Sequence, residues 1–182
     1  MEETALKIKV FPDPVLRRKS RPVAKVTDSH RRILSEMARI MYENSGIGLA
    51  APQVGVSETM IVVDIGNGLY KLINPRVIKR SGRQQMEEGC LSVPGVCLKI
   101  KRAKCIKVRG LDESAKPVAI EAEGLLACVF QHEIDHLKGK LIVDHASFLD
   151  KIKIKGKLKK LKEKAKNERV REPETKSCKL QL

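Results

Sequence analysis

The sequence contains no tryptophan, and aromatic residues make up only 3% of its 182 positions. Aliphatic side chains must therefore supply the hydrophobic core, and a hydrophobic fraction of 42% is enough for one. A chain of this length fits one domain of common size, roughly 100 to 150 residues, together with an appendage. We expect one domain over residues 1–150 and a separate C-terminal segment.

Long apolar runs are also missing. No stretch approaches the roughly 20 apolar residues that span a bilayer. The first ten residues, MEETALKIKV, include acidic side chains and fit neither a secretory signal nor an Arg-rich transit peptide. The five cysteines are odd in number and form no CxxC pair, so no disulfide framework is predicted. We expect a protein of a reducing, soluble compartment without membrane contact, where a thiol can bind a metal.

Positive charge is distributed unevenly. Of the formal net charge of +15, residues 151–182 contribute +9, with 13 Lys and Arg against 4 Asp and Glu. Apolar residues at helical spacing among these lysines predict a basic helix over 151–168, and residues 169–182 are expected to be disordered. Such a segment favours a polyanionic partner, although a solvated lysine-rich helix explains it about equally well.

Apolar periodicity predicts two further helices. One begins at Asp28 or Ser29 and ends near Asn44, and the other runs from Glu123 or Gly124 to Gly139. Strands are predicted at Met60–Val63, Leu69–Ile73, Val96–Ile100, Cys105–Val108 and Pro117–Ile120. Because strands and helices do not alternate regularly, we predict an α+β fold, with antiparallel or mixed sheets packed around a central helix.

The strongest local motif is HEIDH at 132–136, an H-E-x-x-H sequence inside the second predicted helix. Histidines four residues apart project from the same helix face, so His132 and His136 can reach one metal ion. Glu133 lies beside them without having to be a ligand, and its carboxylate can exchange a proton with water and a leaving group. The motif predicts a metal-dependent hydrolase.

A catalytic metal usually needs a third protein ligand. The chain after His136 offers only His145, and neither of the common metalloprotease patterns is met. Cys90 in EEGCLS is the better candidate, although a lone cysteine is more often a buried apolar residue. A third segment, GIGLAAPQ at 46–53, has glycines that allow close backbone approach and ends in Gln53, a hydrogen-bond donor suited to a cavity.

Two other interpretations remain open from the residues alone. A zincin-type endopeptidase would share the H-E-x-x-H helix but would need a downstream ligand. A structural zinc or nucleic-acid-binding module is suggested by the charge and by Cys90 with Cys97. The gap between these cysteines, however, is wider than the two to four residues typical of a structural zinc pair.

The three segments together resemble the signature motifs of the peptide deformylase family: GIGLAAPQ at 46–53, EGCLS at 88–92 and QHEIDH at 131–136. They occur in the family's order and at its usual separations. The resemblance also includes PDPVLR at 12–17 and extends to about Asp150, whereas the later segment resembles the C-terminal helix of some bacterial members only in being basic.

The resemblance implies hydrolysis of the N-formyl group from the formyl-methionine of new proteins, with release of formate, by a metal-bound water. It implies Cys90, His132 and His136 as metal ligands and Glu133 as general base and acid. It implies Gln53 and the Leu91 amide as oxyanion donors. The family's metal is Fe²⁺, with Zn²⁺, Ni²⁺ or Co²⁺ as substitutes, and the residues themselves do not choose among them.

For the substrate, we expect nascent formyl-methionyl chains to lie as an added strand beside Gly46–Gly48. Ile47, Leu125 and Val129 are candidates for the methionine pocket, and Arg102 and Asp135 for supporting the ligands. The stretch GVCL at 95–98 lacks an Arg that some members use to contact substrate. We also expect a bacterial cytoplasmic monomer whose basic C-terminal segment contacts ribosomal RNA.

Overall fold

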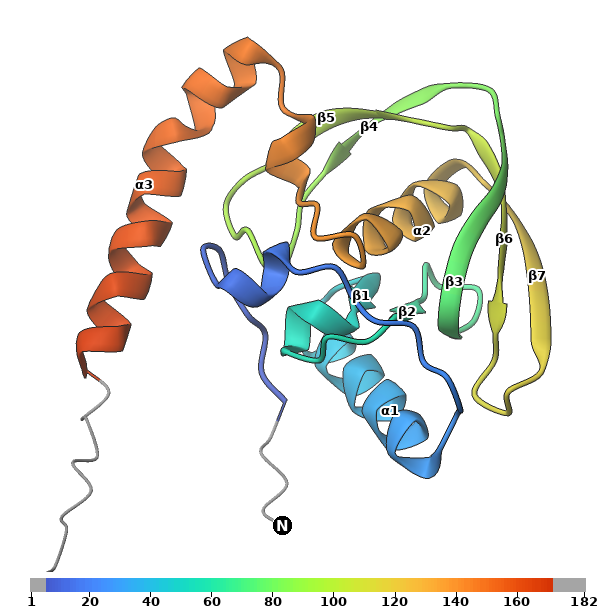
Figure 1. The fold of residues 1–182 in the computed structure, drawn as a ribbon. Helices are drawn as coiled ribbons and strands as arrows, with labels where there is room; N and C mark the ends of the chain where they lie inside the picture. The colour runs from blue at the N-terminus through green and yellow to red at the C-terminus, as the bar shows by residue number, and fades with distance from the viewer. Residues whose placement is uncertain (1–5, 172–182) are drawn as a thin grey trace, which may run out of the picture.

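A computed structural model describes residues 6–171 of the chain (Figure 1). Its helices are α1 (Asp28–Glu43), α2 (Gly124–His136) and α3 (Phe148–Arg171), with short 3-10 helices η1 (Pro14–Arg17), η2 (Ala51–Val54) and η3 (Ile142–His145). Its strands are β1 (Gly48–Ala50), β2 (Met60–Val63), β3 (Tyr70–Ser81), β4 (Gln84–Glu88), β5 (Leu98–Arg102), β6 (Cys105–Leu111) and β7 (Pro117–Glu123). Within the described residues, no helix is both long and apolar enough to cross a membrane.

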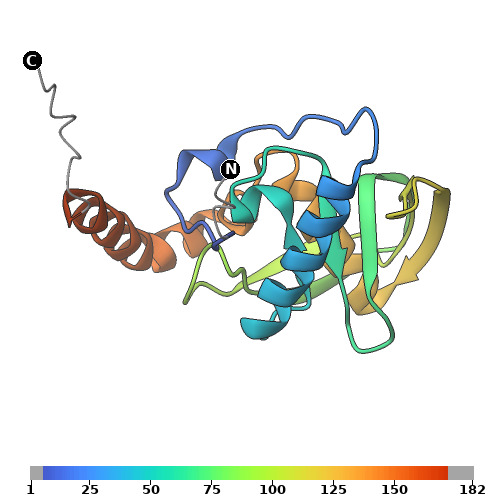
Figure 2. The ribbon, with the colours of Figure 1, turned by 90° about the horizontal axis from the view of Figure 1, so that it is seen from below.

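The strands form two antiparallel sheets around α2. The larger sheet has five strands in the order β1-β2-β3-β6-β7, and β4 pairs with β5 in the smaller one. Figures 1 and 2 show α2 held between the two sheets, with α1 covering the outer side of the β1-β2 region. The predicted α+β fold with a central H-E-x-x-H helix is confirmed.

Both helices predicted within residues 1–150 are present. The predicted strands at Met60–Val63 and Leu69–Ile73 pair as an antiparallel hairpin, with Met60 opposite Ile73 and Val63 opposite Tyr70. The prediction missed β4, whose sequence QQMEE has no apolar alternation. Pairing along its length with β5 satisfies the β4 backbone despite its polar side chains. Strand β3 also extends well past Ile73, because its second half pairs with β6.

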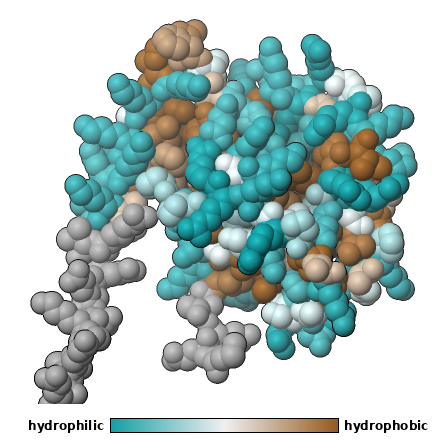
Figure 3. All heavy atoms as spheres, in the orientation of Figure 1, coloured by the Kyte–Doolittle hydropathy of each residue, from teal (hydrophilic) through white to brown (hydrophobic). Residues whose placement is uncertain are grey.

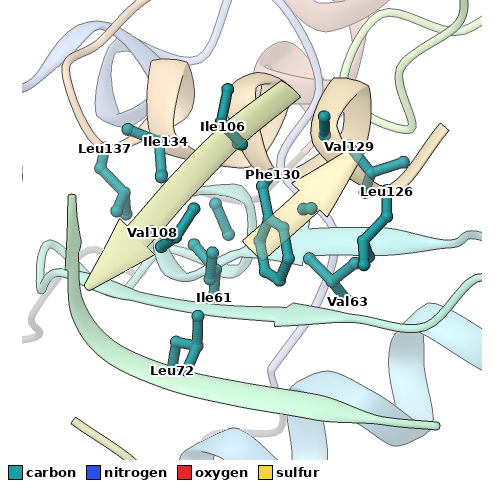
Figure 4. Packing of buried hydrophobic residues seen from close by; sticks show 13 residues of the cluster. Ile61, Val63, Leu72, Ile106, Val108, Leu126, Val129, Phe130, Ile134 and Leu137 are labelled. Carbon is teal, nitrogen blue, oxygen red and sulfur yellow. The ribbon is translucent and has the colours of Figure 1, made fainter. Parts of the chain in front are cut away.

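Strand β2 connects two layers of the hydrophobic core. Its alternate residues Ile61 and Val63 are fully buried. They pack with Phe130 of α2, as Figure 4 shows. Met60 and Val62 face the other way and pack against the apolar stripe of α1. Because this layer is buried on both faces, α2 has a rigid support on the side away from its histidines.

Helix α3 begins and ends differently from the prediction. It starts at Phe148 and continues to Arg171, so the expected division at residue 150 falls inside it. The first three residues expected to be disordered are helical, because the helix simply continues, and residues 172–182 lie outside the described part of the chain.

One face of α3 belongs to the core. Ile154 is buried, and Leu158 and Leu161 pack against the cluster that contains Val93 and Val96. The Lys157 ammonium group also donates a hydrogen bond to the Gly95 carbonyl at 2.6 Å. Three apolar side chains at the start of the helix are exposed instead, at the end where hydrophobic atoms gather in Figure 3: Phe148, Leu149 and Ile152.

Candidate metal centre and active site

Helix α2 brings its two motif histidines onto one face. The Nε2 atoms of His132 and His136 lie 3.2 Å apart. Cys90, in the turn after β4, places its Sγ 3.3 Å from the His136 Nε2. The three donor atoms all lie within 4.8 Å of one another, so residues separated by more than 40 positions meet at one point.

The chemistry of this trio fits a transition-metal ion. One thiol and two imidazoles provide three strong ligands, and no carboxylate completes the set among the described residues, which leaves room for water or substrate. Sulfur with imidazole suits zinc, iron or nickel alike. The trio could therefore hold a metal ion in a site of the open kind, and its donor set does not select the ion.

Glu88 supports the site, although the sequence interpretation did not single it out. Its carboxylate lies 2.9 Å from the Nδ1 atom of His132, so this ring can present Nε2 to a metal. Burial alone would raise the pKa of Glu88, but hydrogen bonds and charge from His132 and Arg102 outweigh it and hold the pKa at about 2. Glu88 follows the exposed Glu87 in a strand, where successive side chains point to opposite faces. This alternation was the available signal that Glu88 faces inward.

Arg102 connects Glu88 to the far side of α2. It donates to both Glu88 oxygens, at 2.5 and 2.9 Å, and to Asp135 at 2.9 Å. Asp135 in turn lies 3.0 Å from His145. The two residues expected to support the ligands, Arg102 and Asp135, are thus in contact, and Arg102 links Asp135 to Glu88. His145, the alternative third ligand, faces Asp135 and is not one of the three clustered donors.

Glu133 is 3% exposed and has an oxygen, Oε2, without a hydrogen-bond partner in the described residues. Burial raises the pKa of this carboxyl group to about 7, against the opposing charges of His132 and Arg102. An unpartnered buried carboxylate is costly to maintain, which indicates a group kept for water or substrate.

Gly48 makes room for this carboxylate. A Cβ atom added at Gly48 would lie 2.4 Å from the Glu133 Oε1 and 2.8 Å from a Val129 methyl carbon. A side chain at position 48 would therefore displace Glu133. The glycine is required here for close approach, as the sequence suggested.

Gln53 lies on η2, and hydrogen bonds hold both the oxygen and the nitrogen of its side-chain amide. Its Oε1 accepts from the Ala50 N–H at 2.7 Å, while its Nε2 donates to Ser92 at 3.2 Å and lies 3.7 Å from the Cys90 sulfur. Within the described residues, the Leu91 N–H donates to no other group. The Leu91 N–H is therefore an available donor beside the candidate metal ligands, and the Gln53 amide is held next to the Cys90 sulfur.

A cavity of about 370 Å³ opens at this site. It includes the predicted substrate-binding residues Gly46, Ile47, Gly48, Leu125 and Val129. Ile47 and Leu125 are 43% and 45% exposed, so they are surface apolar residues at a cavity mouth, and only Val129 is buried. Four further lining residues give no motif of their own and could not be identified from the sequence: Ser45, Met86, Glu87 and Cys128.

Comparison with known proteins gives one family. The family described as Polypeptide deformylase matches residues 5–152. The peptide deformylase of Halothermothrix orenii is 52% identical over 141 residues, which cover 76% of this chain and 92% of that protein. The peptide deformylase of Alkalilimnicola ehrlichii is 47% identical over 160 residues, covering 86% and 90%.

Solved structures of peptide deformylases have a similar fold. A peptide deformylase from Legionella pneumophila superposes with a TM-score of 0.81 at 40% identity, covering 92% of this chain and 99% of that one. A plant peptide deformylase gives a TM-score of 0.87 at 33% identity, covering 92% and 95%. The matched segment, the identity and the shared fold lead to one conclusion: this chain belongs to the peptide deformylase family.

Proposed function

We propose that this protein hydrolyses the N-formyl group from the N-terminal formyl-methionine of newly synthesised proteins and releases formate. The main support is the unpartnered Glu133 carboxylate beside the Cys90, His132 and His136 donors, in a cavity with an apolar mouth. The family membership of the chain points to the same reaction. The setting for such a substrate is the bacterial cytoplasm.

Cys90, His132 and His136 would hold one divalent metal, which we propose is Fe²⁺, with Zn²⁺, Ni²⁺ or Co²⁺ able to replace it. A bound divalent ion supplies Lewis acidity, which polarises a carbonyl and makes water more acidic. Glu88 keeps His132 in the tautomer that binds metal through Nε2.

Glu133 would move the proton. Its free oxygen accepts a proton from the attacking water and returns it to the amine that leaves the formyl carbon. The Gln53 side-chain amide and the Leu91 N–H would donate to the oxyanion of the tetrahedral intermediate. Because both donors are already positioned, little reorganisation accompanies the reaction.

The edge of the sheet offers a place for the substrate backbone. Among the described residues, strand β1 pairs with β2 on one side only, so its other edge can accept an extended peptide of any sequence. Ile47, Leu125 and Val129 would surround the methionine side chain. Main-chain pairing explains how one enzyme accepts many nascent chains.

The test is formate release from a formyl-methionyl tripeptide by anaerobically reconstituted protein, with the acetyl-methionyl tripeptide as control. We expect formate from the first peptide and negligible acetate from the second, because the narrow space at Gly48 and Glu133 favours the smaller acyl group. Cleavage of internal peptide bonds, or no formate with one metal bound per chain, would contradict the proposal.

We also propose that α3 brings the enzyme to ribosomal RNA through its exposed lysines. Deleting residues 151–182 would remove Ile154 from the core, so charge substitution is the cleaner test. Replacing the exposed Lys155, Lys159 and Lys160 by Gln should weaken salt-sensitive co-sedimentation with ribosomes. Association that is unchanged by the substitutions and insensitive to salt would exclude this role.

A further inference from the structure

A second cavity, of about 630 Å³, lies on the other side of α2 from the metal ligands. The end of β3, the β3–β4 turn, β5 and the segments after α2 contribute to its wall. Six basic side chains line it: Arg80, Arg83, Lys101, Arg102, Lys138 and His145. Among residues 6–171, the one acidic lining residue is Asp135, and Arg102 and His145 already contact it.

Four of these cations have no acidic partner in the described part of the chain: Arg80, Arg83, Lys101 and Lys138. Some cations elsewhere on the surface have acidic partners. Arg39 pairs with two glutamates of α1, and Lys107 pairs with Glu121 at 3.0 Å. The four cations that line this cavity therefore share one concavity without an acidic partner among the described residues.

Like charges around a concave surface repel one another, and the low-dielectric walls strengthen their combined field. Neither core packing nor the metal site explains the cluster, because Arg80, Arg83, Lys101 and Lys138 are all exposed. An anion inside the cavity would remove the repulsion. Arginine donors also match the geometry of phosphate oxygens.

We propose that this cavity binds the phosphate group of a small ligand. Its volume lies in the range of small-molecule sites, roughly 300 to 1,000 Å³, and its lining converges from several chain segments. An extended nucleic-acid backbone would instead call for a long basic groove. The proposal does not depend on the deformylase reaction.

Arg102 gives such a ligand a route to the metal site. Its buried guanidinium lines the basic cavity, and the same group donates to Glu88, which lines the metal cavity and contacts His132. A bound phosphate would attract Arg102 in competition with Glu88. Occupancy of one cavity would therefore change metal affinity in the other.

The experiment is a titration of the zinc-loaded full chain with inorganic phosphate at constant ionic strength, followed by the backbone amide NMR signals of Gly82 and Ala103. A nucleoside 5′-monophosphate and a short RNA strand are titrated in parallel. We expect saturable shifts with the two small phosphates. In Arg80→Gln/Arg83→Gln, affinity should fall about tenfold, because two charge-assisted hydrogen bonds are lost.

The matched control is Arg32→Gln/Arg109→Gln, which removes the same charge from exposed positions outside this cavity. Its phosphate affinity should stay within about twofold of the original. Equal weakening in both variants would show a general charge effect and overturn the proposal. Shifts that never saturate, shifts confined to the metal cavity, or binding of the RNA strand alone would overturn it as well.

Discussion

The two cavities beside α2 differ in how their polar groups are held. Around the metal ligands, the side chains of Glu88, Gln53 and His132 are buried and each has a fixed partner. Around the basic cavity, most charged side chains are exposed and unpaired. The first arrangement places atoms to within a fraction of an ångström, as catalysis requires, and the second creates a field without fixed geometry.

Arg102 contacts the polar groups of both cavities. The two cavities can therefore be compared by substituting residues on either side of it. Substitutions at the metal cavity should act on turnover or metal affinity and depend on the shape of the side chain. Substitutions at the basic cavity should change phosphate affinity mainly through the loss of charge. The size of this change should depend on salt concentration.

The largest effect is expected for Glu133→Gln, which keeps the size of the side chain but removes proton transfer. The rate of formate release should fall about 10⁴-fold, because the proposed mechanism uses the carboxylate as both base and acid. Metal content, measured by elemental analysis, should not change. A fully active variant would remove Glu133 from the mechanism.

Gln53→Ala removes one proposed oxyanion donor. Turnover should fall about 10² to 10³-fold at constant metal content. Ser92→Ala is the matched control, because it removes a partner of the Gln53 amide and leaves the donor in place. If the two substitutions cost the same, Gln53 acts only as a packing residue.

Gly48→Ala should displace the Glu133 carboxylate by steric contact, and a shift of about 1 Å at a reacting group can cost about 10²-fold in rate. Gly156→Ala is the control, since an added Cβ there meets nothing within 4 Å. Steady-state kinetics of both proteins measure the effect. Unchanged turnover in Gly48→Ala would mean that Glu133 tolerates displacement.

Arg102→Gln should lower metal affinity about 10 to 100-fold, because Glu88 loses the partner that orients it toward His132. Lys101→Gln, its exposed neighbour on β5 in the same basic cavity, should leave metal affinity unchanged. Competition with a chelator measures both. Equal losses would show that charge alone, rather than orientation of Glu88, supports the metal.

Much of the fold and of the candidate metal site could be predicted from the sequence. The H-E-x-x-H spacing fixes two histidines on one helix face, and the helix period alone determines their proximity. The meeting of Cys90 with them depends on how β4 and β5 pack, which no local pattern contains. The resemblance to the deformylase family predicts this contact, and the structure brings the three residues together.

Other features depend on tertiary contacts and could not be predicted from the sequence. Strand β4 has a polar sequence and forms through pairing with β5. Glu88 gains its role only when Arg102 and His132 converge on it. The basic cavity collects cations from segments far apart in the chain, so composition showed an excess of charge without its location.

The most direct test of the metal-dependent site is an anaerobic titration of metal-free protein with Fe²⁺, in which bound metal and the rate of formate release are measured together. The rate should rise in proportion to bound iron and level off at one ion per chain. In Cys90→Ser, both binding and rate should be strongly reduced. Formate release without metal, or a rate that stays at zero with one ion bound, would contradict the account.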